Sequence, residues 1–271
     1  MTSDVLTIEP HNETAIVWLD RPDKHNAMGR AFWNDLPLAM TELDQDPSVR
    51  VVILAGIGPS FSVGLDLVEF RGVFTTSTSA SPAAAAKVQL DMIRQMQWTM
   101  TSVAECSKPV IAAVHGYCLG GGVDLITAAD IRLASSDAVF SIRETKIAMV
   151  ADIGTLQRLP RIVTAGHVAE LAYTGKDISA KRAAQIGLVN HVYGDQQALM
   201  VAAHEMASEI AGNSPLAVQG VKHVLAAGES RTTSEALEYV ALYNASFLRS
   251  SDLNEAMISF AEKRPPEYVG E

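Results

Sequence analysis

The chain has 271 residues, of which 48% are hydrophobic, and its formal net charge at pH 7 is −10. This length and composition allow one large domain, or one domain with a helical appendage, around a sizeable core. The negative charge argues against nucleic-acid and anionic-membrane binding, because both polyanions would repel the protein. We therefore expect neither nucleic acid nor membrane as a partner.

The sequence pattern of the N-terminal two-thirds of the chain predicts an α/β fold with a parallel sheet. Apolar, β-branched runs alternate with segments of helical periodicity, and parallel strands require crossover connections of this kind. The predicted elements in chain order are a hairpin of strands 5–8 and 15–19, a helix ending near residue 43, a strand over 49–56, a helix near 86–105, a strand over 108–116 and a strand pair within 131–142.

The C-terminal part reads as helical throughout, with Ser214 as a predicted N-cap. We expect two parts, an α/β core over residues 1–195 and a helical region over residues 196–271. The small-residue stretch 75–86 is interpreted as a surface loop, with a substrate-covering flap as the alternative.

Cysteine usage and the N-terminal sequence bear on the compartment. Cys106 and Cys118 form no CxxC pair, so neither a disulfide framework nor a zinc-thiolate site is predicted. The opening MTSDVLTIEP contains two acids and lacks both a basic segment and an apolar run. From these features we expect a cytoplasmic protein.

Two similar glycine-containing turns follow the two predicted core strands. FSVGLDL occupies residues 61–67 and LGGGVDL occupies residues 119–125. Glycine allows close backbone approach, and the start of a helix leaves N–H groups without internal partners. Tight helix–strand packing would explain either turn alone. The pair favours an oxyanion hole, in which the amides of Leu65 and Gly121 bind a carbonyl oxygen that gains charge.

Three acids follow these turns. Asp124 lies near the start of a predicted helix, and Glu144 and Asp152 lie in a mostly apolar stretch. Around one apolar pocket, three carboxylates would raise one another's pKa, so that one site holds both a base and an acid. The alternative for Asp124 is a charge stabilised by the helix dipole. For Glu144 and Asp152 the alternatives are solvation or an ion pair with Arg143, Lys146 or Arg158.

Other catalytic motifs are absent from the sequence. It has no GxSxG elbow, no P-loop, no strand followed by GxGxxG and no HExxH, and its seven histidines are scattered. We therefore expect no metal.

Over nearly its full length the chain resembles the crotonase (enoyl-CoA hydratase/isomerase) superfamily. The resemblance is carried by WLDRPDKHNAM, FSVGLDL, KPVIAAVHGYCLGGGVDL, GTLQRLPR and FAEKRPP. It implies a crotonase-like spiral of ββα units with a helical C-terminal trimerisation region. It also implies an acyl-CoA thioester substrate and a homotrimer or homohexamer (a dimer of trimers). Coenzyme A is then part of the substrate, and no separate cofactor is expected.

Within the superfamily, the acids at Asp124, Glu144 and Asp152 most resemble the pattern of the Δ3,5-Δ2,4-dienoyl-CoA isomerases. This implies that Glu144 removes a proton from C2 of a 3,5-dienoyl-CoA and that Asp124 delivers one to C6. The amides of Leu65 and Gly121 would hold the thioester oxygen of the dienolate. Asp152 would adjust or orient Glu144. The product is a 2,4-dienoyl-CoA of fatty-acid β-oxidation.

The resemblance also implies contacts to CoA. Arg21 and Lys24 are expected near its phosphates, and Lys263 is expected to reach it from a helix near a neighbouring subunit, with simple solvation as the alternative for each. Val63 stands where the family commonly has alanine and would narrow the channel. The full substrate-binding set is Arg21, Lys24, Ala27, Val63, Gly64, Asp66, Leu67 and Lys263.

Two other functions remain open at this point. An enoyl-CoA hydratase would use Asp124 and Glu144 to position water, but Asp is one methylene shorter than the usual Glu. A non-catalytic binding protein of the same fold, including RNA-binding members, is disfavoured by the acidic charge and by the three acids.

Overall fold

The computed structural model describes residues 3–75 and 81–271, and its strands form two sheets. One sheet has six strands in the order β1-β2-β3-β4-β6-β9, and the other has three in the order β5-β7-β8. The strands are β1 Leu6–His11, β2 Thr14–Leu19, β3 Val51–Gly56, β4 Val110–Val114, β5 Tyr117–Leu119, β6 Ile131–Ser135, β7 Val139–Ser141, β8 Ile178–Ser179 and β9 His191–Tyr193. β1 is antiparallel to β2, and the remaining pairs of the large sheet are parallel.

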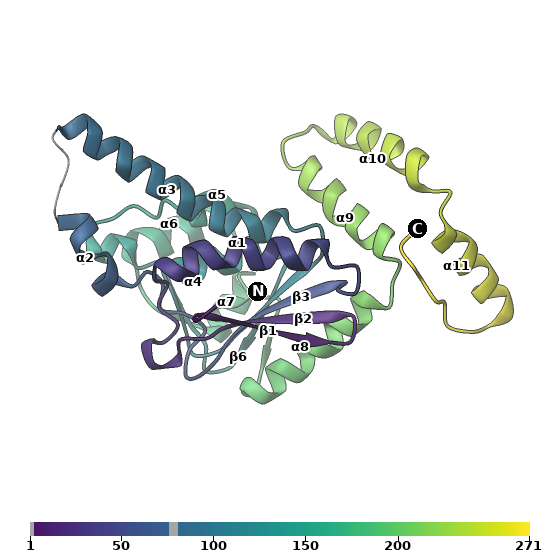
Figure 1. Cartoon of the computed structure of the whole chain (residues 1–271), viewed down its shortest axis with the longest axis horizontal. Helices are drawn as coiled ribbons and strands as arrows, with labels where there is room; N and C mark the ends of the chain where they lie inside the picture. The colour runs from purple at the N-terminus through teal and green to yellow at the C-terminus, as the bar shows by residue number, and fades with distance from the viewer. Residues whose placement is uncertain (1–2, 76–80) are drawn as a thin grey trace.

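Helices cover both faces of the large sheet (Figure 1). The α-helices are α1 Arg30–Gln45, α2 Leu67–Thr75, α3 Pro82–Glu105, α4 Gly121–Ala128, α5 Thr155–Arg158, α6 Ala165–Thr174, α7 Ala180–Gln185, α8 Gln196–Ala211, α9 Pro215–Gly228, α10 Thr233–Phe247 and α11 Ser251–Glu262. The 3-10 helices are η1 Pro22–Lys24, η2 Glu144–Ile147 and η3 Leu159–Arg161. Among the described residues, no helix is both long and apolar enough to cross a membrane.

One face of the sheet carries a row of isoleucines in register. Ile16 pairs with Ile53, Ile53 with Ile111, and Ile111 with Ile131. Because side chains alternate along a strand, this row lies on one face, where it packs on the small buried side chains of α8. The opposite face packs on α1, α3 and α4 in a larger core.

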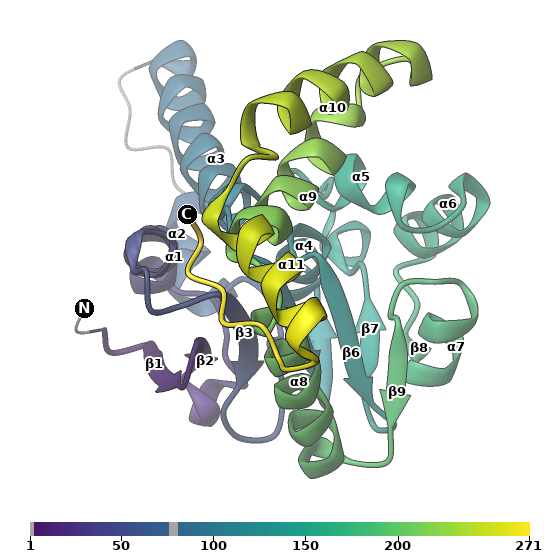
Figure 2. The same cartoon turned by 90° about the vertical axis from the view of Figure 1, so that its right-hand side faces the viewer.

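The packing of α8 bears on the expected boundary near residue 195. α8 packs on the large sheet, whereas α9, α10 and α11 lie to one side of the sheets in Figure 1. In Figure 2, where that side faces the viewer, they lie in front of the sheets. The chain end returns to the core, because Arg50 donates to the carbonyl oxygens of Ala211 at 2.9 Å and Tyr268 at 2.7 Å. The boundary near residue 195 stays a prediction, and the first helix after it, α8, packs on the sheet.

Two local expectations need correction. The strands within 131–142 do not pair with each other, because residues 136–138 carry the chain from the large sheet at β6 to the small sheet at β7. The stretch 75–86 is not a loop throughout, because the Ser81 hydroxyl accepts from the Ala84 N–H and caps a helix that begins at Pro82. Residues 76–80 of this stretch lie outside the described residues.

Candidate active site

A cavity of about 360 Å³ lies where the two glycine turns meet. Parallel β3 and β4 end at the same edge of the sheet, and the turn that follows each of them reaches this edge. Isolated bridges join Ser62 to Cys118 and Met28 to Leu65 across the turns. Val63, Leu65 and Leu67 of the first turn therefore line the cavity together with Gly121 of the second.

Gly64 and Gly121 bring the two backbones into contact. Gly64 has φ +82°, and a Cβ there would lie 2.7 Å from the Leu119 oxygen and 2.9 Å from the Gly121 nitrogen. A side chain would therefore be strained and would collide with the second turn. Neither the Leu65 N–H nor the Gly121 N–H donates to another described residue. Both predicted oxyanion-hole amides are thus free donors beside the cavity.

Glu144 lies at the start of η2 and lines the cavity. A Cβ on Gly120 would lie 3.3 Å from Oε1 of Glu144, so the carboxylate lies against the second glycine turn. Its Oε2 is buried without a hydrogen-bond partner among the described residues. Burial first, and then the charges of Asp124 and Asp152, raise the pKa of Glu144 to about 7.

Asp152 also lines the cavity, from the loop between η2 and α5. Burial raises the pKa of its carboxyl above the ordinary value. No described cation lies within ion-pair distance of Asp152. The Arg158 guanidinium, one of the expected alternative partners, instead donates to Thr101 Oγ1 at 2.9 Å. The cavity therefore holds two carboxyls with raised pKa values beside two free amides.

Asp124 takes a different place from the one expected. Its side chain on α4 is 0% exposed and is not part of the cavity lining. Oδ1 accepts from the Thr155 N–H at 2.5 Å, and Oδ2 has no partner among the described residues. Burial is the main cause that raises the pKa of Asp124 to about 6, and the charge of Asp152 raises it further. The hydrogen bonds from Thr155 and the charge of Arg158 act in the opposite direction and lower this pKa. Asp124 is therefore a buried neighbour of Glu144.

The predicted CoA-binding residues fall into separate groups. Arg21 donates to the Ala27 oxygen at 2.7 Å and to Asp66 Oδ2 at 3.2 Å, so its guanidinium holds the turn together. Lys24 is half exposed, 3.9 Å from Asp66. Lys263 is exposed at the end of α11. The structure brings Arg21, Ala27 and Asp66 into one cluster and leaves both lysines accessible.

The sequence reasoning missed one whole wall of the cavity. Gln89, Met92, Ile93 and Met96 of α3 line it, with Trp33 of α1 beside them. Their spacing at i, i+3, i+4 and i+7 is the pattern of one helix face, which the sequence does contain. That this face meets Glu144 and Asp152 depends on tertiary packing, which the spacing does not reveal.

Comparison with known proteins identifies the family. Residues 9–271 match the family model described as enoyl-CoA hydratase/isomerase. The chain is 46% identical to a Dictyostelium discoideum protein named Delta(3,5)-Delta(2,4)-dienoyl-CoA isomerase, mitochondrial, over 97% of this chain and 90% of that one. It is 44% identical to an Arabidopsis thaliana protein named as the peroxisomal enzyme, over 93% and 91%. The chain therefore belongs to the enoyl-CoA hydratase/isomerase family.

Solved structures confirm the predicted crotonase-like fold class. An enoyl-CoA hydratase from Bacillus anthracis superposes with a TM-score of 0.91 at 31% identity, over 99% of this chain and 100% of that one. A putative enoyl-CoA hydratase from Streptomyces coelicolor gives the same TM-score at 32% identity, over 100% and 96%.

The expected cytoplasmic location is wrong. The relatives from D. discoideum and A. thaliana are named mitochondrial and peroxisomal. The expectation rested on the composition of the first ten residues and on cysteine usage. Organelle addresses are short signals read by receptors, and the composition of a folded domain does not encode them.

Proposed function

We propose that this protein is a Δ3,5-Δ2,4-dienoyl-CoA isomerase acting in fatty-acid β-oxidation. The observation that carries the proposal is the pair of cavity-lining carboxyls, Glu144 and Asp152, opposite the free amides of Leu65 and Gly121. The relatives named as this isomerase, at 44–46% identity over most of the chain, support it. An acyl-CoA thioester is then the substrate.

The chemistry begins with a proton transfer to Glu144. With a pKa of about 7, a large fraction of this carboxyl is ionised near neutral pH, and it can accept a proton from C2 of the 3,5-dienoyl thioester. The electrons of the broken C–H bond extend the conjugated system into a dienolate. The Leu65 and Gly121 amides donate to the thioester oxygen as it becomes negative, which lowers the barrier because they are fixed beforehand.

The second proton transfer is to C6, and we assign it to Asp152 rather than to Asp124. Asp152 lines the cavity, whereas Asp124 is wholly buried with one oxygen bonded to Thr155. Burial raises the pKa of Asp152, which favours the protonated form that a proton donor needs. After one turnover Glu144 holds the proton and Asp152 is ionised. Transfer between the two carboxyls, or exchange with water, restores the starting state.

The direct test supplies purified protein with a 3,5-dienoyl-CoA and follows the ultraviolet absorbance of the 2,4-dienoyl product. The proposal expects product, and Glu144→Gln should reduce its rate by about 100-fold or more. No product from the wild-type protein would reject the proposal. Hydration of crotonyl-CoA at a comparable rate would make enoyl-CoA hydratase the better assignment.

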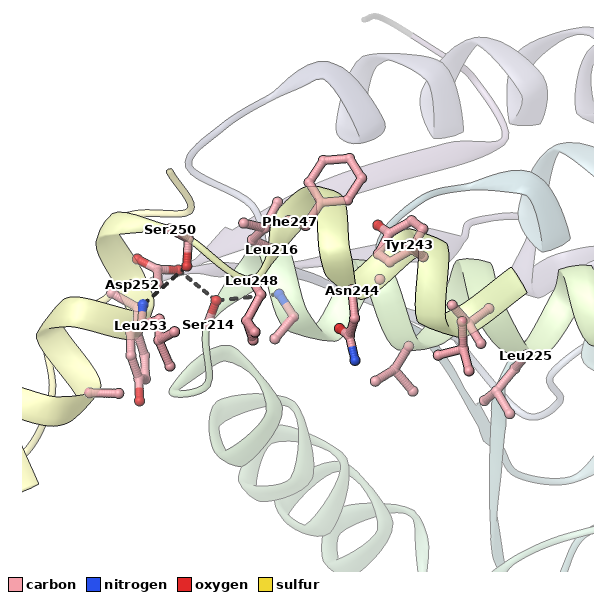
Figure 3. A pocket seen from close by; sticks show the side chains of 17 residues that line it. Ser214, Leu216, Leu225, Tyr243, Asn244, Phe247, Leu248, Ser250, Asp252 and Leu253 are labelled. Atoms are coloured by element: carbon pink, nitrogen blue, oxygen red, sulfur yellow. Dashed lines mark hydrogen bonds between the residues drawn. The ribbon is translucent and has the colours of Figure 1, made fainter. Parts of the chain in front are cut away.

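We also propose that the protein assembles as a trimer through its C-terminal helices. α9, α10 and α11 enclose an apolar hollow of about 450 Å³ (Figure 3). Around it, Leu225 is 69% exposed, Leu248 56% and Phe247 46%. An apolar patch of this size on a single chain is typical of a protein–protein interface.

Light scattering of the purified protein tests the assembly. Leu225→Asp places a charge in the hollow and should release monomers. Leu38→Asp is the control, because Leu38 is similarly exposed on α1 and outside the hollow. A monomeric wild-type protein, or a trimer that tolerates Leu225→Asp as well as Leu38→Asp, would contradict this proposal.

A further inference from the structure

A hydrogen bond joins α3, which forms one wall of the cavity, to the opposite wall. Gln89, Met92, Ile93 and Met96 line the cavity from one face of the helix, and Gln97 follows Ile93 by four residues on the same face. Gln97 is exposed, and its Nε2 donates to the backbone oxygen of Asp152 at 2.7 Å. The end of the wall is thus bonded to the residue that carries a cavity-lining carboxyl.

The loop that contains Asp152 has few other anchors. On one side of it, the Met149 N–H donates to the Glu144 oxygen at 2.9 Å. On the other side, the Gly154 oxygen accepts from the N–H groups of Gln157 and Arg158, and the Thr155 N–H donates to Asp124. Between these points, residues 150–153 make no other backbone hydrogen bond to a different element of the described chain. Ala151 and Ile153 pack on the core, and the Gln97 amide supplies the hydrogen bond that ties the Asp152 backbone to another element.

The helix that bears Gln97 is itself firmly held. Thr99 Oγ1 donates to the Trp33 oxygen at 2.8 Å, so α3 is joined to α1 two residues after Gln97. Gln97 therefore joins α3 to a span whose backbone makes no other hydrogen bond to a different element of the described chain.

We propose that Gln97 is a positioning residue, which holds Asp152 against the α3 wall and thereby fixes the place of its carboxyl in the cavity. The inference rests on the isomerase function proposed above. Gln97 contacts the Asp152 backbone and not the reacting atoms, so it acts on the proton transfer to C6 through geometry. A small misplacement of a catalytic group is enough to lower a rate strongly.

Matched substitutions on one helix test this role. Gln97→Met keeps the side-chain length and removes the donor, and should lower kcat by about 10-fold with KM within about twofold of wild type. Gln95→Met removes an exposed amide with a bond of the same 2.7 Å length, two residues away, and should leave both constants unchanged.

Hydrogen exchange supplies a readout that needs no turnover. The hydrogen-bonded amides of Met149 and Thr155, which flank residues 150–153, should exchange faster in Gln97→Met than in the wild type or in Gln95→Met. Unchanged exchange in Gln97→Met, or an equal loss of kcat in Gln95→Met, would overturn the role of Gln97. If the wild-type protein forms no 2,4-dienoyl product, the proposed function fails, and the exchange rates still decide whether Gln97 anchors Asp152.

Discussion

The Thr155 N–H donates to Oδ1 of Asp124 over 2.5 Å and joins the start of α5 to an acid buried on α4. This bond holds one oxygen of the Asp124 carboxyl, and Asp124 is not among the residues that line the cavity. Asp124 can still act on the site through its charge, because that charge is the largest cause after burial that raises the pKa of Glu144. Asp124 is therefore placed to adjust the proposed base.

Asp124→Asn should move the pH profile of kcat/KM. Glu144 must be ionised to accept a proton, so activity rises with pH through its pKa of about 7. Removing the charge of Asp124 lowers the pKa of Glu144, so the acidic limb should shift to lower pH. The profile between about pH 5 and 9 measures this shift. Asp91→Asn, at an exposed position on α3, is the control. An unmoved limb in Asp124→Asn would contradict coupling of the two acids.

Asp152→Asn should separate the two proton transfers. Glu144 remains able to remove the C2 proton, so exchange of that position with D2O should persist while formation of the 2,4-diene falls by about 100-fold or more. Mass spectrometry of the recovered thioester measures the exchange, and absorbance measures the product. If Asp124→Asn abolishes product formation while Asp152→Asn preserves it, the role of C6 donor returns to Asp124.

The sequence predicted the parts of the site that are local motifs. The two glycine turns, the amides of Leu65 and Gly121, and the apolar setting of Glu144 all follow from residue types within short segments. The strands of the large sheet were also predictable from short segments, because buried parallel strands have continuous apolar, β-branched sequences.

The remainder depends on contacts between distant segments. The bond from Gln97 to Asp152 spans 55 residues, and the burial of Asp124 depends on α5 folding onto α4. Arg21 was expected near a CoA phosphate because the family resemblance places its segment there, with simple solvation as the alternative. The structure instead places its guanidinium on Asp66 and the Ala27 oxygen. Residue type alone does not distinguish a free cation from one that holds a turn together.

Gly64→Ala should damage the proposed oxyanion hole. The added methyl group would lie 2.9 Å from the Gly121 nitrogen and would force the turns apart, and the φ of +82° adds strain. We expect kcat to fall by about 100-fold or more, with a lower melting temperature. Gly72→Ala is the control, because among the described residues outside its own stretch of α2 none lies within 4 Å of the added methyl group. Equal behaviour of the two variants would contradict the importance of close contact between the turns.

Glu144→Gln should make the protein more stable at alkaline pH while removing activity. The folded-state pKa of about 7 lies above the ordinary value of 4.5, so the unfolded chain releases this proton more readily. The free energy of unfolding of the wild type therefore falls as pH rises from about 4.5 to 7. Above that range the whole of this loss of stability remains.

Glutamine has nearly the same size as glutamate and carries no charge. At pH 8 the variant should exceed the wild type by on the order of 2 kcal/mol in its free energy of unfolding, and the difference should shrink as Glu144 becomes protonated at low pH. Denaturant unfolding at both ends of the range measures it, with Glu205→Gln at an exposed position on α8 as the control. A difference that does not depend on pH would contradict burial of the charged carboxylate as its cause.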